Sequence, residues 1–140
     1  MATINSFEDL KVWQKSRELC QQIFYIMHTD KFAKDYALKD QINRSSGSIM
    51  DNIAEGFGRQ STNEFIHHLA IASGSLLEVK SQLYRALDRN YISKIKFENI
   101  MEIINEIGKM LTALIAYLNK SDIRGLKFKD RNDNPKPTKN

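Results

Sequence analysis

Apolar residues recur at helical spacing along most of the chain and predict four long helices. The most regular row lies near the C-terminal end, where successive members alternate three and four steps, as in a heptad seam. Its members are Phe97, Ile100, Ile104, Ile107, Leu111, Leu114 and Leu118. Both prolines, Pro135 and Pro137, follow this row, so no proline interrupts any helix. The pattern therefore predicts an all-α fold.

Local signals set the expected helix ends. Ser6 is a good N-cap for the first helix, and the charged stretch 29–35 is predicted to be a connection. The second helix carries Leu38, Ile42, Ile49 and Ile53, and it continues through the weak helix formers at 45–48 because the apolar rows on both sides stay in register.

Two further helices complete the prediction. Gly56 and Gly58 tolerate positive φ and are expected to end the second helix. Ser61 and Glu64 match a capping box that starts the third helix, which runs to about Arg89. Ser93 caps the fourth.

Long helices with short connections favour an antiparallel, up-down-up-down four-helix bundle over residues 1–123, followed by a disordered basic tail at 124–140. The first and fourth helices each carry a second apolar row, which is more than one bundle needs. We expect this surplus to drive assembly into a homo-oligomer. The alternative is that the wider rows serve a thicker core of a monomer.

The net charge of +4 is unevenly distributed along the chain. Residues 1–123 hold 15 basic and 15 acidic side chains, whereas residues 124–140 hold six basic and two acidic ones. Within the neutral body, residues 80–96 carry five basic side chains against Asp88 alone. We therefore expect a local basic patch where the third and fourth helices join, together with a basic tail.

Catalytic and metal-binding patterns are weak in this sequence. Glu64 and His67 fit one Glu-x-x-His step, but a di-iron bundle requires a second such step and further glutamates. Arg59 and His67 are spaced too far apart for the usual motif of nucleases that use an arginine and a histidine. We expect no enzyme activity and no cofactor or metal. A single cysteine, Cys20, and the lack of a long apolar run favour the cytoplasm and no membrane contact.

A polar stripe follows one face of the second helix at steps of three or four residues. It comprises Arg44, Ser48, Asn52, Glu55 and Arg59. It is predicted to be a structural polar seam, in which Arg44 and Glu55 pair with Glu78 or Gln82 of the third helix. The functional alternative is contact with RNA or with a partner protein.

Three separated segments resemble the four-helix bundle proteins encoded in 23S ribosomal RNA intervening sequences. They are 7–14 (FEDLKVWQ), 41–59 (QINRSSGSIMDNIAEGFGR) and 69–78 (LAIASGSLLE). The accessory variability protein of diversity-generating retroelements belongs to the same fold group. The resemblance implies a homopentameric ring or barrel and, for the retroelement relatives, association with a reverse transcriptase and with RNA.

These observations lead to a non-enzymatic, oligomeric accessory protein that binds RNA or DNA with little sequence preference, RNA being favoured. The residues expected to contact phosphate are Lys80, Arg85, Arg89, Lys94, Lys96, Arg124, Lys127 and Lys129. Tyr84 and Tyr91 lie nearby and could stack on unpaired bases. The alternative is a protein scaffold that docks an enzyme such as a reverse transcriptase, without touching nucleic acid. A ribonuclease is a distant third hypothesis.

Overall fold

The computed structural model describes residues 3–120, and this part of the chain is helical and contains no strand. Its elements are a short 3-10 helix η1 (Phe7–Asp9) and the helices α1 (Lys11–Met27), α2 (Asp30–Lys34), α3 (Tyr36–Gly58), α4 (Thr62–Asp88) and α5 (Lys94–Lys120). The all-α prediction is confirmed. The tail at 124–140 lies outside the described residues.

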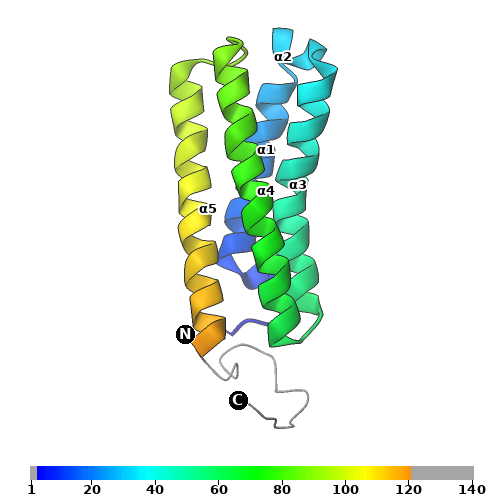
Figure 1. Ribbon diagram of the computed structural model, residues 1–140, viewed down its shortest axis with the longest axis vertical. Coiled ribbons are helices and arrows are strands. Elements are labelled where there is room, and N and C mark those ends of the chain that lie inside the picture. Colours follow the sequence, from blue (N-terminus) through cyan, green and yellow to red (C-terminus); the bar gives the residue numbers. More distant parts are fainter. Residues whose placement is uncertain (1–2, 121–140) are drawn as a thin grey trace.

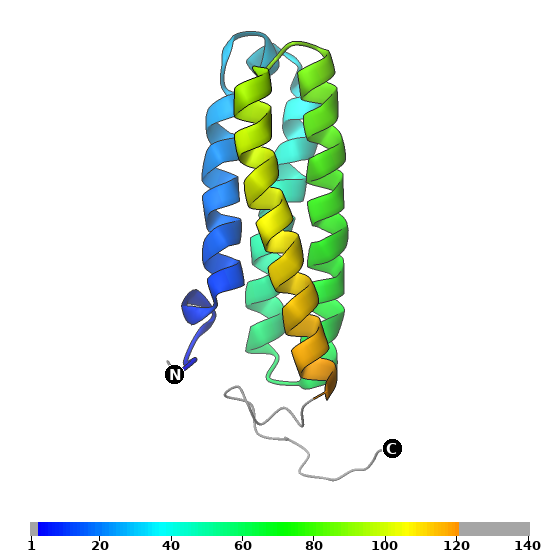
Figure 2. The same cartoon turned by 90° about the vertical axis from the view of Figure 1, so that its left-hand side faces the viewer.

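The four long helices lie side by side, and each runs opposite to the long helix before it (Figures 1 and 2). Helix α3 packs against α1 and most extensively against α4, while α5 packs against α4 and α1. This order brings the short helix α2 and the α4–α5 connection to the same end of the molecule (Figure 1). No described helix is long and apolar enough to cross a membrane.

The core is built from one apolar row on each long helix. On α5 every member of the predicted heptad row is buried except Leu114, which is half-buried. On α1, Leu19 and Ile23 point into the core, whereas Phe24 of the second row is 56% exposed. Phe24 and the neighbouring Tyr25 therefore leave an apolar flank on α1 that the protomer does not cover.

The chain enters α1 later than the sequence predicts. Asp9 accepts a hydrogen bond from the Ser6 backbone N–H at 3.1 Å, and this closes the turn of η1. Leu10 then adopts an extended conformation and inserts its side chain into the core, so α1 begins at Lys11 rather than at Ser6. Ser6 is an N-cap residue, as the sequence predicts, but it caps the separate turn η1 and not α1.

The stretch 29–35 is not a simple connection, because it contains the one-turn helix α2. Phe32 is fully buried and stacks on Tyr91, with ring centroids 5.3 Å apart and planes inclined by 27°. One large side chain therefore anchors this short helix over the end of the core. The sequence did not predict α2, because charged residues surround Phe32 and no apolar row is visible.

Small residues allow α3 and α4 to approach closely, as predicted, but the positions differ. A Cβ added to Gly56 would lie 2.6 Å from Cβ of His68, so only glycine fits there. Gly47 and Gly74 face open space instead, while Ser45, Ser46 and Ser75 are buried. No described glycine has positive φ; the left-handed residue after α3 is Gln60, at φ 54°. Gly56 thus serves close packing rather than helix termination.

Candidate nucleic-acid interface and polar seam

The predicted basic patch lies at the end of the molecule where α2 meets the α4–α5 connection. Arg89, the C-cap residue of α4, donates a hydrogen bond to Asp35 Oδ2 at 2.9 Å, and the Tyr91 hydroxyl donates to the same oxygen at 2.8 Å. Asp35 Oδ1 in turn accepts from the Leu38 N–H and caps α3. One carboxylate therefore joins three elements and fixes the geometry of this end.

The environment of Asp35 favours its charged form. The hydrogen bond from Tyr91, with the Leu38 N–H and the Arg89 guanidinium, holds the pKa of this carboxyl below its usual value. The same bond raises the pKa of the Tyr91 hydroxyl, because the neighbouring carboxylate disfavours a phenolate. Asp35 therefore offsets the charge of Arg89, which is less free to bind phosphate than the sequence suggests.

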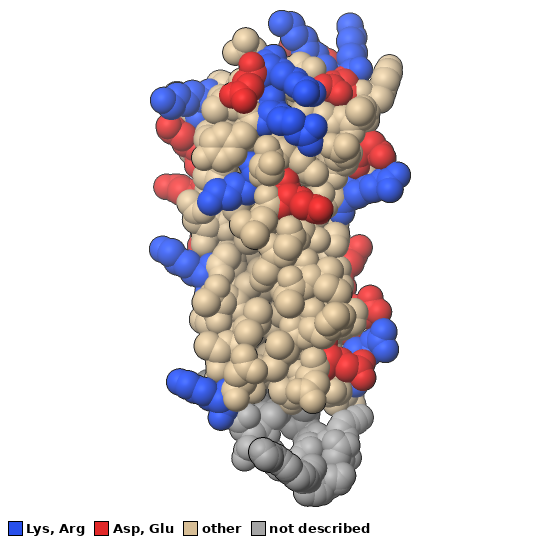
Figure 3. Space-filling model, in the orientation of Figure 1, with Lys and Arg blue, Asp and Glu red and all other residues tan. Residues whose placement is uncertain are grey.

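Two lysines that the charge count overlooked, Lys31 and Lys34, lie at the same end as the predicted Lys94. Lys31 and Lys34 project from α2, and Lys94 begins α5. All three are exposed, and none has an ion-pair partner among the residues that the structure describes. Figure 3 shows basic side chains gathered at this end with acidic ones between them, above a largely uncharged central face. Only the fold reveals that α2 contributes to the patch.

The other predicted phosphate contacts are more scattered. Arg85 donates to Gln41 Oε1 at 2.7 Å, so it lies against α3. Lys96 reaches Gln22 of α1 at 3.5 Å. Lys80 lines an apolar groove between α4 and α5, away from the end. The structure thus brings Arg85, Arg89 and Lys94 towards the same end as α2 and leaves Lys80 apart.

Three predicted tail residues, Arg124, Lys127 and Lys129, lie outside the described residues. Of the two tyrosines near the patch, Tyr91 stacks on Phe32 and donates its hydroxyl hydrogen bond to Asp35. Tyr84 is 50% exposed, with its ring 5.0 Å from Phe97 in an edge arrangement. Tyr84 therefore keeps a free face that could stack on a base.

The polar stripe of α3 forms a seam against α4, but its pairings differ from the expectation. Arg44 pairs with Asp40 at 3.1 Å and Glu55 pairs with Arg59 at 3.0 Å, both within the same helical segment. Glu78 and Gln82 are instead engaged by Ser45, which the predicted stripe omitted. The predicted pairing of Arg44 and Glu55 with Glu78 or Gln82 is wrong, because i,i+4 partners on α3 are closer at hand.

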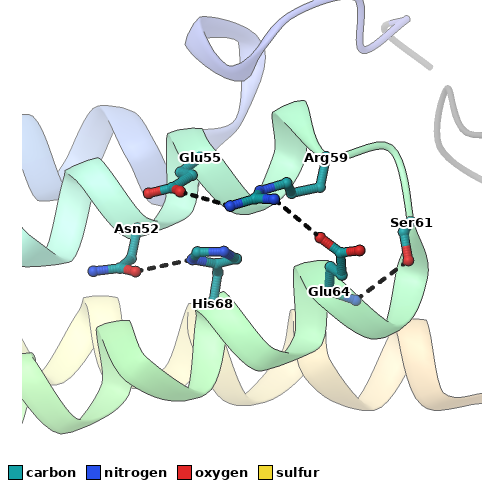
Figure 4. Close-up of polar contacts among 6 residues, drawn as sticks. All are labelled: Asn52, Glu55, Arg59, Ser61, Glu64 and His68. Carbon is teal, nitrogen blue, oxygen red and sulfur yellow. Dashed lines mark hydrogen bonds and ion pairs between the residues drawn. The ribbon is translucent and has the colours of Figure 1, made fainter.

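Short side chains make the direct contacts across the rest of the seam. The Ser75 hydroxyl donates to Ser48 Oγ at 2.8 Å, and Asn52 donates to the same oxygen at 3.0 Å. Asn52 Oδ1 also lies 3.0 Å from His68 Nδ1 (Figure 4). His68 therefore has a structural partner on α3 and is not simply solvated.

Arg59 lies between two carboxylates at the α3–α4 turn (Figure 4). Its guanidinium is 3.0 Å from Glu55 and 3.5 Å from Glu64. Ser61 accepts from the Glu64 N–H at 3.4 Å, so half of the predicted capping box forms while the Glu64 carboxylate turns to Arg59. Exposed pairs of this kind stabilise by about 0.2–1 kcal/mol each.

The Glu64–His67 step does not form part of a larger ligand set. Across residues 3–120, no group of three or more His, Cys, Asp or Glu side chains is placed to hold a metal ion. His67 is exposed and its ring lies 5.8 Å from that of His68. Glu64 is engaged by Arg59, as described above.

Comparison with known proteins identifies the fold. The family model of the 23S rRNA-intervening sequence protein matches residues 8–113, which is most of the helical body. The chain belongs to this family. A crystal structure of a protein of unknown function from the S23 ribosomal protein family of Bacteroides thetaiotaomicron VPI-5482 is similar, with a TM-score of 0.70 and 31% identity. The match covers 75% of this chain and 95% of that one. None of the curated proteins matches.

Membership of the 23S rRNA-intervening sequence protein family accounts for the resemblance of the three segments. Two of them, 41–59 and 69–78, contain the residues at which α3 and α4 meet. Within the segments, Gly56, Ser45, Ser48 and Ser75 make or permit these close contacts. The recognisable part of the sequence therefore specifies the α3–α4 packing, and the basic end lies largely outside it.

Proposed function

We propose that this protein is a non-enzymatic accessory protein that binds nucleic acid, preferentially RNA, as an oligomer of four-helix bundles. The observation that supports it best is the group of exposed, unpaired lysines at the α2 end of the molecule. Lys31, Lys34 and Lys94 extend beyond a framework held by Asp35 and offer phosphate contacts without base readout. The name of the family links its members to 23S rRNA and favours RNA as the ligand.

Assembly of several copies, a pentameric ring as the family resemblance implies, would strengthen the binding. A single end mixes lysines with Asp30 and Asp88, so its field is modest. Copies arranged around an axis would present the same lysines side by side, and a track of repeated positive charges binds a polyanion more tightly than one patch does. The uncovered apolar flank at Phe24 and Tyr25 supports such assembly.

Salt-dependent RNA binding tests this proposal. We expect the affinity of the full chain for a single-stranded RNA to fall steeply between about 50 and 200 mM salt, since phosphate contacts release counterions. A version ending at residue 123 measures the contribution of the tail, including Arg124, Lys127 and Lys129. Absent or salt-insensitive binding would contradict the proposal.

The second candidate is a scaffold that docks an enzyme such as a reverse transcriptase without touching nucleic acid. One observation favours it: a groove of about 680 Å³ between α4 and α5, lined mostly by apolar or small residues that include Leu77, which is 65% exposed. Grooves of this kind accept helices. The scaffold hypothesis excludes contact with nucleic acid, so direct binding of RNA by the purified chain would contradict it. If Leu77→Asp also left this RNA binding unchanged, the groove would have no part in it.

A further inference from the structure

A polar pocket opens between α3 and α4, apart from the basic end. It has a volume of about 460 Å³ and is lined by Gln41, Arg44, Ser45, Ser48, Ser75, Glu78 and Gln82. Its walls carry hydroxyl, amide and carboxylate groups and the Arg44 guanidinium, and no aromatic ring. A nucleobase would therefore find no aromatic ring to stack on, whereas a small hydrogen-bonding group would find many partners.

Two acceptors in this pocket could take a further hydrogen bond. Gln82 is 8% exposed and donates through Nε2 to Ser45 Oγ at 3.1 Å, while its Oε1 has no hydrogen-bond partner among the described residues. Glu78 has no ion pair in residues 3–120, and its one hydrogen bond, from Ser45, is long at 3.4 Å. A buried acceptor such as Gln82 Oε1 is normally satisfied, and the exposed Glu78 carboxylate beside it carries no ion pair within the described part of the chain, so the pocket can accept a further donor.

The further donor has the chemistry of a guanidinium. A guanidinium offers five N–H groups in a planar fork, enough for a carboxylate and an amide oxygen together. Arg44 lines the same pocket, but it is turned towards Asp40 at 3.1 Å. The pocket is therefore suited to an arginine from another copy of the chain.

Arg17 is the arginine of the described chain that has no acceptor. Arg44, Arg59, Arg85 and Arg89 each contact a side-chain oxygen, whereas Arg17 only lies over the Trp13 ring, 5.9 Å from its centroid. Arg17 is exposed, and it lines a shallow apolar hollow on α1 whose other members are Cys20, Gln21, Phe24 and Tyr25.

The two surfaces lie on neighbouring sides of the molecule and at the same height. Cys20 Sγ is 3.2 Å from the Ser46 carbonyl oxygen, which places the Arg17 flank of α1 beside α3, level with Ser45 of the pocket. The pocket opens on the other side of α3, towards α4. Copies rotated about an axis parallel to the helices must touch through patches at equal height, and different patches on each partner make a head-to-tail contact.

We propose that the α3–α4 pocket receives Arg17 of a second copy of this chain, with the guanidinium on Glu78 and Gln82 and with Phe24 and Tyr25 covering the rim. This contact rests on the self-assembly in the proposed function and assigns residues to it. Because the two patches face different directions, repeating the contact turns each copy by the same angle, which gives a ring when the rotation closes.

Charge reversal tests the contact directly. Arg17→Glu and Glu78→Arg should each raise the protein concentration at half-assembly by about 30-fold or more, the effect expected for breaking a hydrogen-bonded charge pair at an interface. Sedimentation velocity over a concentration series measures this shift. The double variant restores opposite charges in swapped positions and should return most of the assembly.

Matched controls are Lys11→Glu and Glu98→Arg, which make the same charge changes at exposed residues of α1 and α5. They should assemble as the unaltered chain does, and circular dichroism should show native helix content in all variants. If the unaltered chain assembles and the single reversals leave it unchanged, this contact is wrong while assembly stands. If the unaltered chain is a monomer at all concentrations, assembly and the contact both fail, and RNA binding by the basic end is judged separately.

Discussion

Asp35 holds together the end of the molecule at which α2 meets the α4–α5 connection. It caps α3, accepts from Tyr91 and holds Arg89, and these partners come from segments more than 50 residues away along the chain. Without this carboxylate, Arg89 and Tyr91 would lose their common anchor. The arrangement offsets the charge of Arg89 and leaves the exposed lysines of this end without ion-pair partners among the described residues.

The pKa of Asp35 gives a prediction about acid stability. Because its pKa is lowered in the folded chain, Asp35 stabilises the fold above the usual aspartate pKa of about 3.9, and this stabilisation disappears as the pH falls through the lower folded value. Asp35→Asn should therefore lower the melting temperature at pH 7 and have a much smaller effect near pH 2.

Tyr91→Phe is the companion variant for this test, because it removes the hydroxyl and keeps the ring on Phe32. It should lower the melting temperature at pH 7, and its effect should also shrink in acid. An effect of Asp35→Asn that is equal at both pH values would show that the charge of Asp35 contributes no stability.

Replacing Gly56 and Gly47 of α3 by alanine should change the stability of the fold in opposite directions. Gly56→Ala should destabilise the fold by about 1–3 kcal/mol, since the new methyl group would overlap His68 Cβ and crowd Phe65. Gly47→Ala faces open space in the interior of α3 and should stabilise it by about 0.5–1 kcal/mol. Urea unfolding measures both, and equal effects would contradict the close α3–α4 packing.

At the scale of elements, the four long helices follow from the sequence and α2 does not. Periodic apolar rows locate α1, α3, α4 and α5 because each row is long enough to show its period. Helix α2 has five residues and one buried side chain, Phe32, whose partner Tyr91 is distant in sequence. A single apolar residue has no period, so only the tertiary contact reveals this element.

Shortening the Phe32 side chain tests its role as the anchor of α2. Phe32→Ala should cost about 3–5 kcal/mol of unfolding free energy, because it empties a fully buried site between α2 and Tyr91. Ile95→Ala removes a large apolar side chain that is 72% exposed near the same end and should change stability by no more than about 0.5 kcal/mol. Similar losses in the two variants would show that Phe32 is not a core anchor.

At the scale of the molecule, sequence reasoning predicted the helices and part of the candidate site. Arg85, Arg89 and Lys94 could be grouped because they are neighbours along the chain. Lys31 and Lys34 could not, since only the packing of α2 brings them to the same end. Likewise, the predicted pairing of Arg44 with Glu78 failed because Asp40 lies one helical turn away and competes for the guanidinium.

The molecule carries three chemically different surfaces. The α2 end carries unpaired lysines, the flank of α1 carries exposed aromatics, and the α3–α4 side carries a pocket with acceptors for a further hydrogen bond. Assembly through the second and third surfaces would leave the first one free. Variants of the first surface therefore test the proposed nucleic-acid binding, and variants of the other two test the proposed assembly.

The salt dependence of RNA affinity tests the central claim most directly. Replacing Lys31, Lys34 and Lys94 together by alanine should weaken binding and flatten the slope of log affinity against log salt by about 2, given roughly 0.7 per phosphate contact on a single strand. The matched control replaces Lys11, Lys109 and Lys120, exposed lysines that lie away from the α2 end, and should keep the original slope. Equal slopes for the two triple variants would contradict binding at the basic end.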